Sequence, residues 1–288
     1  MKHFVVLLIV FFCITQHILS LEYGSLPQKP TDRPSVALVL AGGGAKGFCH
    51  IAVLELLDEL DIPVDIVFGR SIGSIMGGLY SAGYSGTELA HIAPTLDWPY
   101  IFNDTTVSPR EALLKDHAIT ESAIAIGSEH TGGILSGQRV YETLKRLTVR
   151  VPYTHSFNEL PIPFRAVSTN LLTGKEELLY KGDLAEAIRA SMSIPSVFAP
   201  YEIDGTYYVD GCVTDNIPIL AAKEMGYDII IAVELSEELI SDIATFKQNS
   251  TAAVSQWLNI PQIERSQSAY SAADLVIFPD MTQFSTMD

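Results

Sequence analysis

Apolar runs and amphipathic stretches alternate along most of the chain. The runs SVALVLA, VDIVFG, DIIIAVEL and ADLVIFPD are typical of strands buried in a sheet. Six further segments have a pattern that predicts helices: 48–60, 71–83, 84–93, 136–148, 183–193 and 217–226. This alternation predicts an α/β fold, a three-layer α/β/α domain with a largely parallel central sheet.

Turn and cap residues separate these segments. Residues 163–180 are typical of two joined strands, and residues 202–211 of a hairpin. The pattern is irregular over residues 97–135, where we expect a hairpin or a lid over the site. Four residue pairs mark the predicted caps and turns: Ser85/Glu88, Asp183/Glu186, Thr173-Gly174 and Asp204-Gly205.

The N-terminal residues differ from the rest of the chain. An apolar run over residues 4–14, followed by a more polar end, is typical of a secretory signal peptide that is cut after Ser20. An uncleaved membrane anchor is the alternative. We expect a signal peptide at 1–20, a proline-rich linker at 21–34 and one domain at 35–282. The protein is then exported to the periplasm, to the outer membrane or out of the cell.

Composition narrows the classes of partner. The chain has 288 residues, of which 48% are hydrophobic and 18% are charged, so it is not a disordered protein. Its net charge of −16 argues against a nucleic-acid partner, because phosphate binding needs a basic face. The cysteines that follow the predicted signal peptide are Cys49 and Cys212. They could pair in an oxidising compartment, but we favour two isolated buried thiols.

A serine stands between two glycines directly after the second predicted strand. Gly69, Arg70, Ser71, Ile72 and Gly73 spell G-x-S-x-G, and a helix is predicted to follow. A serine on such a strand-to-helix turn exposes its hydroxyl at the positive end of the helix, which suits a nucleophile. A tight turn that happens to carry a serine explains the motif alone equally well.

A glycine-rich loop follows the first predicted strand. Its six residues are Gly42, Gly43, Gly44, Ala45, Lys46 and Gly47. The pattern also fits G-x-G-x-x-G of dinucleotide-binding proteins, which need an acidic residue near the end of the second strand. Asp61 and Asp65 both precede that strand, so this interpretation fails. A phosphate-binding P-loop fails as well, because the lysine is followed by glycine.

A third use of the loop fits better. Backbone N–H groups at a helix N-terminus can hold a negative oxygen, and beside a serine nucleophile they form an oxyanion hole. The first and second strands are expected to be neighbours in a parallel sheet, which would bring the loop next to Ser71. A glycine-rich turn that serves only close packing is the alternative.

The serine hydroxyl needs a base. In a Ser-Asp-His triad the acid and then the histidine follow the serine in the chain. No histidine follows residue 155, so both would have to lie between residues 72 and 155. Asp116 and His155 are available, but they lie in irregular stretches. Asp210 ends a predicted strand and is followed by Gly211, so its carboxylate could reach a serine at the end of another strand. Burial would raise the pKa of Asp210 and make it a better base. An Asp-Gly pair on its own, however, often forms only a turn.

The three motifs GGGAKG, GRSIG and DGC, in this order, resemble the patatin-like phospholipase family. The likeness runs from about Ser35 to Asp280 and is similar to the bacterial, exported branch. The resemblance implies a serine–aspartate dyad without a histidine. By it, Ser71 is the nucleophile, Asp210 is the general base, and the loop from Gly42 to Gly47 forms the oxyanion hole.

The motifs do not assign a role to four residues near them. Cys212 stands where the family usually has glycine or alanine, and it either crowds the aspartate or adds a reactive thiol. Arg70 could meet a lipid phosphate, but we expect it on the surface. His50 is interpreted as a packing residue. Asn216 either orients the aspartate loop or belongs to a plain turn.

The resulting prediction is an exported lipid acyl hydrolase of the phospholipase A or lysophospholipase type. It acts on phospholipid or another acyl-ester lipid at a membrane surface. We expect no cofactor and no metal, because no cluster has ligand spacing. The alternatives are a carboxylesterase for soluble esters and a non-catalytic envelope-binding module. Some envelope members of the family carry further domains, so the sequence is either a stand-alone lipase or a piece of a longer protein.

Overall fold

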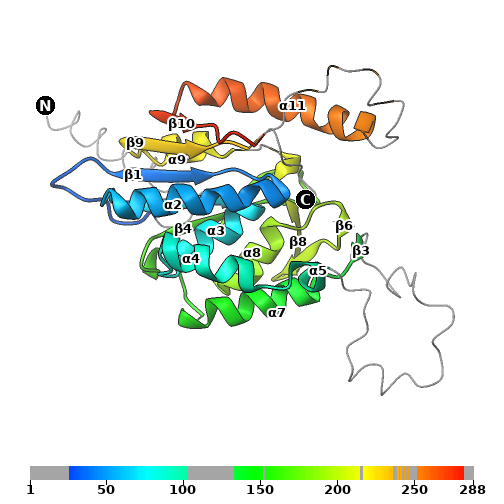
Figure 1. The fold of residues 1–288 in the computed structure, drawn as a ribbon, viewed down its shortest axis with the longest axis horizontal. Coiled ribbons are helices and arrows are strands. Elements are labelled where there is room, and N and C mark those ends of the chain that lie inside the picture. Colours follow the sequence, from blue (N-terminus) through cyan, green and yellow to red (C-terminus); the bar gives the residue numbers. More distant parts are fainter. Residues whose placement is uncertain are drawn as a thin grey trace, which may run out of the picture.

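A mixed sheet forms the middle layer of the protein (Figure 1). The computed structural model describes residues 26–102, 133–151, 153–214, 217–235 and 252–281, together with 239, 241, 243 and 246. Within these residues the sheet has the strand order β10-β9-β1-β2-β4-β8-β7, and β5 also pairs with β4. The strand bounds are β1 (Val36–Leu40), β2 (Ile66–Arg70), β4 (Phe164–Asn170), β5 (Glu176–Leu179), β7 (Tyr201–Ile203), β8 (Thr206–Asp210), β9 (Ile229–Val233) and β10 (Leu275–Ile277).

The sheet is parallel over five strands and antiparallel at one side. β10, β9, β1, β2 and β4 are parallel to one another, whereas β5 and β8 pair antiparallel with β4, and β7 pairs antiparallel with β8. β4 is longer than β2 and runs past its end, so that Val167 lies opposite Arg70 and Ser168 lies opposite Asp210. Two consecutive residues of β4 therefore bring the carboxyl ends of β2 and β8 together.

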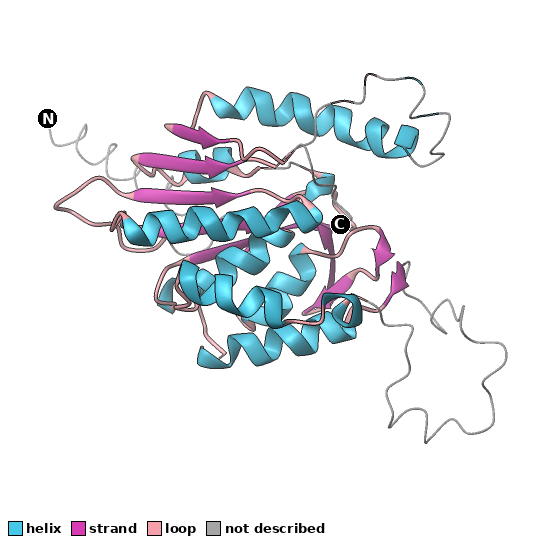
Figure 2. Cartoon of the chain, in the orientation of Figure 1, coloured by secondary structure: helices cyan, strands magenta, loops and turns pink. Residues whose placement is uncertain are grey.

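Helices cover both faces of this sheet (Figure 2). α2, α3, α4, α7 and α8 pack on one face, and α9 and α11 pack on the other. The α-helix bounds are α2 (Cys49–Glu59), α3 (Ile72–Ser81), α4 (Gly86–Ile92), α5 (Trp98–Ile101), α7 (Gln138–Leu147), α8 (Leu184–Ser191), α9 (Ile219–Glu224) and α11 (Ala252–Tyr270). The 3₁₀ helices are η1 (Gly44–Phe48), η2 (Ala93–Thr95), η3 (Thr148–Arg150), η4 (Phe157–Glu159) and η5 (Gly211–Val213), and a small second sheet pairs β3 (Gly133–Leu135) with β6 (Ser196–Phe198).

The two apolar cores explain the continuous apolar runs of the sequence. Along β1, Leu38 and Leu40 face the core beneath α2 and α3, whereas Ala37 and Val39 face the core beneath α9 and α11. A strand covered on both faces has no polar side. The predicted three-layer α/β/α fold with a largely parallel sheet is confirmed.

The predicted caps and turns form as the sequence indicates. The Ser85 hydroxyl accepts from the Glu88 N–H at 3.1 Å, and the Glu88 carboxylate accepts from the Ser85 N–H at 2.9 Å. Asp183 caps α8 by accepting from two backbone N–H groups. Asp204 and Gly205 both have positive φ, 49° and 78°, as the tight hairpin between β7 and β8 requires.

Parts of the architecture are not predicted from the sequence. α11 is absent from the predicted elements, because Pro261 interrupts its pattern and a proline normally breaks a helix. The small β3–β6 sheet is also missed. Residues 26–34 of the predicted linker form neither helix nor strand and lie against the domain, where the Lys29 ammonium donates to the carbonyl oxygens of Met225 and Gly226.

Several predictions concern residues that the structure does not describe. The predicted signal peptide at 1–20 and residues 103–132 of the predicted lid lie outside the described residues, as do Asp116 and Asn216. In the parts of the chain that are described, no helix combines the length and apolar character needed to span a bilayer.

Candidate active site

Ser71 occupies a sharp turn between β2 and α3. Its backbone has φ 51° and ψ −122°, a strained conformation for a residue with a side chain. Its carbonyl oxygen accepts from the N–H groups of Ser74 and Ile75 at 2.9 and 3.2 Å, so the helix starts directly from the turn. The hydroxyl therefore stands at the N-terminus of α3, as the motif predicts for a nucleophile.

The two glycines of the elbow are required by close backbone contacts. A Cβ added at Gly69 would lie 2.5 Å from the carbonyl oxygen of Gly73. A Cβ added at Gly73 would lie 2.6 Å from the carbonyl oxygen of Ala41 and would also overlap that of Leu40. Because Leu40 and Ala41 lead into the glycine loop, the elbow and the loop are in direct contact.

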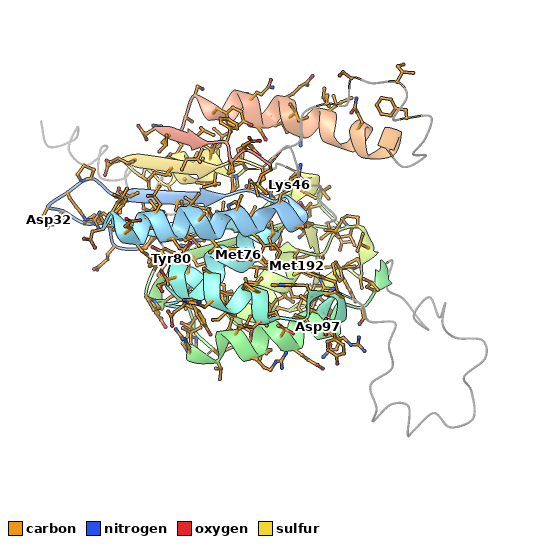
Figure 3. All side chains as sticks on the ribbon, in the orientation of Figure 1. Asp32, Lys46, Met76, Tyr80, Asp97 and Met192 are labelled. Carbon is orange, nitrogen blue, oxygen red and sulfur yellow. The ribbon has the colours of Figure 1, made fainter. Side chains whose placement is uncertain are left out.

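The glycine loop packs against the elbow on its other side as well. Gly44 has a φ of 57°, which favours glycine, and η1 begins there and contains Ala45 and Lys46. A Cβ at Gly47 would overlap the side chain of Ile72, and one at Gly43 would lie 2.8 Å from Leu235 Cβ. The predicted proximity of the loop to Ser71 is therefore confirmed. Figure 3 labels Lys46 near the start of α2.

His50 fixes the first peptide group of the loop. The side chain is fully buried, and its Nε2 donates to the Ala41 carbonyl oxygen at 2.9 Å. Burial lowers the pKa of His50 to about 4, so the ring is neutral near pH 7. Since the peptide between Ala41 and Gly42 is trans, its N–H points away from His50. Among the described residues, no backbone carbonyl accepts from the N–H groups of Gly42 and Gly43.

Asp210 lies at the end of β8 and is fully buried. Its Oδ1 accepts from the Cys212 N–H at 2.8 Å. Burial raises the pKa of Asp210 above its usual value, while the Cys212 N–H, the Ser71 hydroxyl and the charge of Arg70 oppose this rise. Oδ2 has no partner in hydrogen-bonding geometry among the described residues, although the Ser71 hydroxyl is near enough to favour the ionised carboxylate.

Arg70 is not on the surface, so this prediction is wrong. Its side chain is fully buried, and Nη2 forms an ion pair of 3.2 Å with Glu176 Oε2. A Cβ at Gly211 would lie 2.6 Å from Arg70 Nε. Arg70 therefore packs beneath the aspartate loop and explains the glycine after Asp210. It is not available to a lipid phosphate from outside.

The surroundings of both cysteines disfavour the reactive thiolate form. Cys49 and Cys212 are both free, as expected, but each is half-buried and not fully buried. Burial raises the pKa of Cys49 to about 11. Burial and the charge of Asp210 raise the pKa of Cys212 well above its usual value, so thiolate is disfavoured at both positions. Within the described ranges, no three His, Cys, Asp or Glu side chains converge as metal ligands would.

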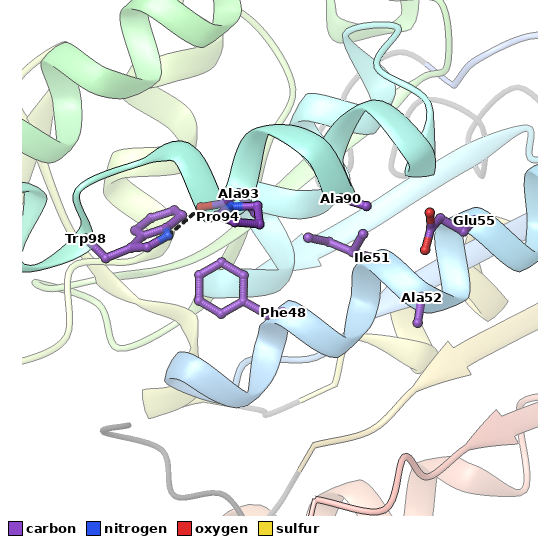
Figure 4. A pocket seen from close by; sticks show the side chains of 8 residues that line it. All are labelled: Phe48, Ile51, Ala52, Glu55, Ala90, Ala93, Pro94 and Trp98. Atoms are coloured by element: carbon purple, nitrogen blue, oxygen red, sulfur yellow. Dashed lines mark hydrogen bonds between the residues drawn. The ribbon is translucent and has the colours of Figure 1, made fainter.

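A shallow apolar groove lies beside this site and not at it (Figure 4). It has a volume of about 430 Å³ and runs between α2 and the segment from α4 to α5. The ring of Phe48, the last residue of η1, packs edge-on against the Trp98 ring with centroids 5.0 Å apart. Its lining includes no residue of the serine elbow or the aspartate loop: Phe48, Ile51, Ala52, Glu55, Ala90, Ala93, Pro94 and Trp98.

A comparison with known protein families agrees with the three motifs. Residues 38–223 match the family described as Patatin-like phospholipase, and the matched segment contains the glycine loop, the serine elbow and the aspartate loop. The chain belongs to the patatin-like phospholipase family. The family resemblance of the sequence motifs is thereby confirmed.

Relatives of this patatin domain occur in bacteria and in fungi. An uncharacterized NTE family protein of Mycobacterium tuberculosis is 33% identical over 245 residues, which cover 85% of this chain and 60% of that protein. Lysophospholipase NTE1 of Kluyveromyces lactis is 30% identical over 201 residues, which cover 70% of this chain and 12% of that protein. The chain thus spans about 60% of the length of its mycobacterial relative.

Among solved structures, VipD from Legionella pneumophila is similar to this chain with a TM-score of 0.46 and 17% sequence identity. The superposition covers 80% of this chain and 56% of VipD.

Replacement of Gly73 tests the contact between elbow and loop. Gly73→Ala should abolish hydrolysis and destabilise the fold by about 1–3 kcal/mol, because the new methyl group must push the Ala41 carbonyl away. Urea unfolding and an ester assay measure the two effects. Ser74→Ala is the matched control, since the buried Ser74 hydroxyl has no hydrogen-bond partner in the described structure. Normal activity in Gly73→Ala would contradict the packing described here.

The buried carboxyl group of Asp210 has a consequence for stability. In the unfolded chain an aspartate has a pKa of about 3.9, whereas burial raises the pKa of Asp210 in the fold. The folded state therefore loses stability as pH rises through the raised pKa. Asp210→Asn, which keeps an oxygen for the Cys212 N–H, should be more stable than the natural protein at neutral pH. Urea unfolding should show this difference shrinking toward about pH 4.

Proposed function

We propose that this patatin domain is an exported lipid acyl hydrolase of the phospholipase A or lysophospholipase type. The observation that carries the proposal is the contact of three parts: a serine on a strained turn, a glycine loop packed against that turn, and a buried aspartate beside the serine. The family is named for phospholipases, and the fungal relative is named a lysophospholipase. The sequence of residues 1–20 supports export.

The first half of the reaction forms an acyl-enzyme. The Ser71 Oγ attacks the ester carbonyl carbon while its proton moves to the Asp210 carboxylate. The carbonyl oxygen becomes negative and accepts hydrogen bonds from the N–H groups of the loop that begins at Gly42. The tetrahedral intermediate then collapses, the bond to the leaving alkoxide breaks, and Asp210 returns the proton to that oxygen.

The second half releases the fatty acid. A water molecule gives its proton to Asp210 and attacks the acyl carbon, and the second tetrahedral intermediate uses the same N–H groups. Collapse breaks the bond to Ser71 Oγ, which takes the proton back from Asp210. Atoms and charge balance with water as the only co-reactant.

A buried aspartate suits the role of base better than an exposed one. A carboxylate in water is a weak base at neutral pH, and burial raises the pKa of Asp210 toward the working range. The neutral His50 points to the Ala41 carbonyl and takes no part in the dyad. In the proposed mechanism the buried carboxylate of Asp210 takes the role of base without a histidine.

Two exposed leucines favour a substrate in a lipid surface. β4 continues beyond the end of β2, and the turn that follows it carries Leu171 and Leu172, which are 48% and 81% exposed. The Leu171 N–H bonds to the Tyr207 carbonyl at 2.8 Å, which ties this turn to β8. The turn therefore projects beyond the edge of the sheet that carries Ser71. Apolar side chains at this position can enter the bilayer interface and bring the site to its substrate.

The reaction class is tested with two substrates and two variants. The natural protein should release fatty acid from phosphatidylcholine vesicles, and Ser71→Ala and Asp210→Asn should each lose at least about a thousandfold of this activity. Circular dichroism checks that both variants fold. Cleavage of p-nitrophenyl butyrate without cleavage of phospholipid would indicate a soluble-ester carboxylesterase instead. Full activity in Ser71→Ala would overturn the proposal.

The leucine turn gives a separate prediction for membrane contact. Leu172→Asp should lower hydrolysis of vesicles about tenfold or more and leave hydrolysis of p-nitrophenyl butyrate unchanged, because it removes apolar contact with lipid but touches no site residue. Leu60→Asp is the matched control: Leu60 is 58% exposed and lies at the C-terminal end of α2, away from the loop at its start. Equal effects of the two substitutions would exclude the turn from lipid contact.

A further inference from the structure

The C-terminal end of α8 contacts the backbone of both residues of the proposed dyad. The Ser71 N–H donates a hydrogen bond of 3.1 Å to the hydroxyl of Ser191, the last residue of α8. The Asp210 N–H donates one of 2.9 Å to the carbonyl oxygen of Ser193. Residues 191–193 thus hold two backbone segments that are far apart in the sequence.

The Ser191 hydroxyl both donates and accepts a hydrogen bond. It is fully buried, donates to the Val167 carbonyl oxygen at 2.6 Å and accepts from the Ser71 N–H. Val167 lies opposite Arg70 where β4 pairs with β2. One oxygen atom therefore joins α8, β4 and the elbow. Without it, the buried Ser71 N–H and Val167 carbonyl would each lose a hydrogen bond.

Arg189 fixes Ser193, the residue that accepts from the Asp210 N–H. The guanidinium is fully buried, and its Nη1 donates to the Ser193 hydroxyl at 2.7 Å. The Ser193 hydroxyl in turn donates to the Arg189 carbonyl oxygen at 2.9 Å. Nη2 donates to the Ser136 carbonyl at 2.8 Å, and Nε donates to that of Gly137. The residue that accepts from the Asp210 N–H is thus fixed by a charged group anchored before α7.

These bonds restrain the backbone of the two residues whose side chains must meet in the proposed reaction. The Ser71 turn is strained, and a strained conformation persists only where its surroundings fix it. Because the Ser71 N–H is bonded to Ser191, it is not free to serve the oxyanion. The short stretch from Ser191 to Ser193 sets where the nucleophile and the base lie relative to each other.

We propose that residues 189–193, which we call the α8 clamp, position the dyad, and that Ser191 is its positioning residue. This inference rests on the proposed function, because it assigns a role within the same site. The clamp acts through the backbone of Ser71 and Asp210 and touches no substrate. Its loss should misplace Ser71 against Asp210 and lower kcat, while KM stays unchanged.

The test compares Ser191→Ala with a matched substitution. Ser81→Ala removes a hydroxyl that is equally buried but has no hydrogen-bond partner in the described structure. Ser191→Ala should lower kcat about 10- to 100-fold with KM within about twofold, and Ser81→Ala should change neither. Ser191→Cys, which keeps a weak donor and acceptor of similar shape, should lie between the natural protein and Ser191→Ala and also serves if Ser191→Ala does not fold.

Two further readouts separate positioning from a purely structural role. Misplacement of the Ser71 hydroxyl removes one group that favours the ionised Asp210, so the acidic limb of the kcat/KM profile should move to higher pH in Ser191→Ala. Hydrogen exchange at the peptide that contains Ser71 should accelerate in this variant and not in Ser81→Ala. The exchange measurement does not depend on catalysis, so it still tests the clamp if the protein hydrolyses no ester.

Two results would overturn the proposal that the α8 clamp positions the dyad. One is a kcat of Ser191→Ala and Ser191→Cys within about twofold of Ser81→Ala when the natural protein is active. The other is a loss of activity that matches the loss of folded protein, with an unchanged pH profile and unchanged exchange. By contrast, full activity of Ser71→Ala would overturn the proposed function and leave the exchange result to decide on the contact itself.

Discussion

Two consecutive residues of β4 determine where the site lies. Val167 pairs with Arg70 at the end of β2, and Ser168 pairs with Asp210 at the end of β8. Since neighbouring strands lie about 4.8 Å apart and β2 and β8 flank β4, these two pairs bring the last residues of β2 and β8 close together. The direction of β8 is opposite to that of β2, so a base can arrive from the antiparallel side of an otherwise parallel sheet. The positions of the loop, the elbow and the clamp all follow from this pairing.

The electrostatics of the site follow from the same packing. Burial raises the pKa of Asp210, and Arg70 beneath the aspartate loop limits the rise. Arg70 also forms an ion pair with Glu176, which is partly exposed. Burial raises the pKa of Asp210, and a raised pKa would make this carboxylate a better base for the proposed acyl transfer.

Local patterns in the sequence predict the sheet, the helices and the three motifs, because each depends on neighbouring residues. The buried position of Arg70 is not local, since it depends on Glu176 and Gly211, which reach it only in the folded sheet. Ser191 gives no sequence signal for the same reason: its partners are main-chain atoms of β4 and the elbow. Helix α11 is missed because its proline contradicts the local rule.

The two functional parts of the site are held by different helices. His50 of α2 bonds to the Ala41 carbonyl, and the N–H of the same peptide points away from His50. The Ser191 hydroxyl of α8 accepts from the Ser71 N–H. Different helices therefore hold the groups that would stabilise the oxyanion and the groups that would move the proton. The loop and the elbow touch at Gly73 and Gly47, where a Cβ atom would not fit. A side chain added at either glycine would have to push the loop and the elbow apart, and in the proposed mechanism this would move the oxyanion site away from the nucleophile.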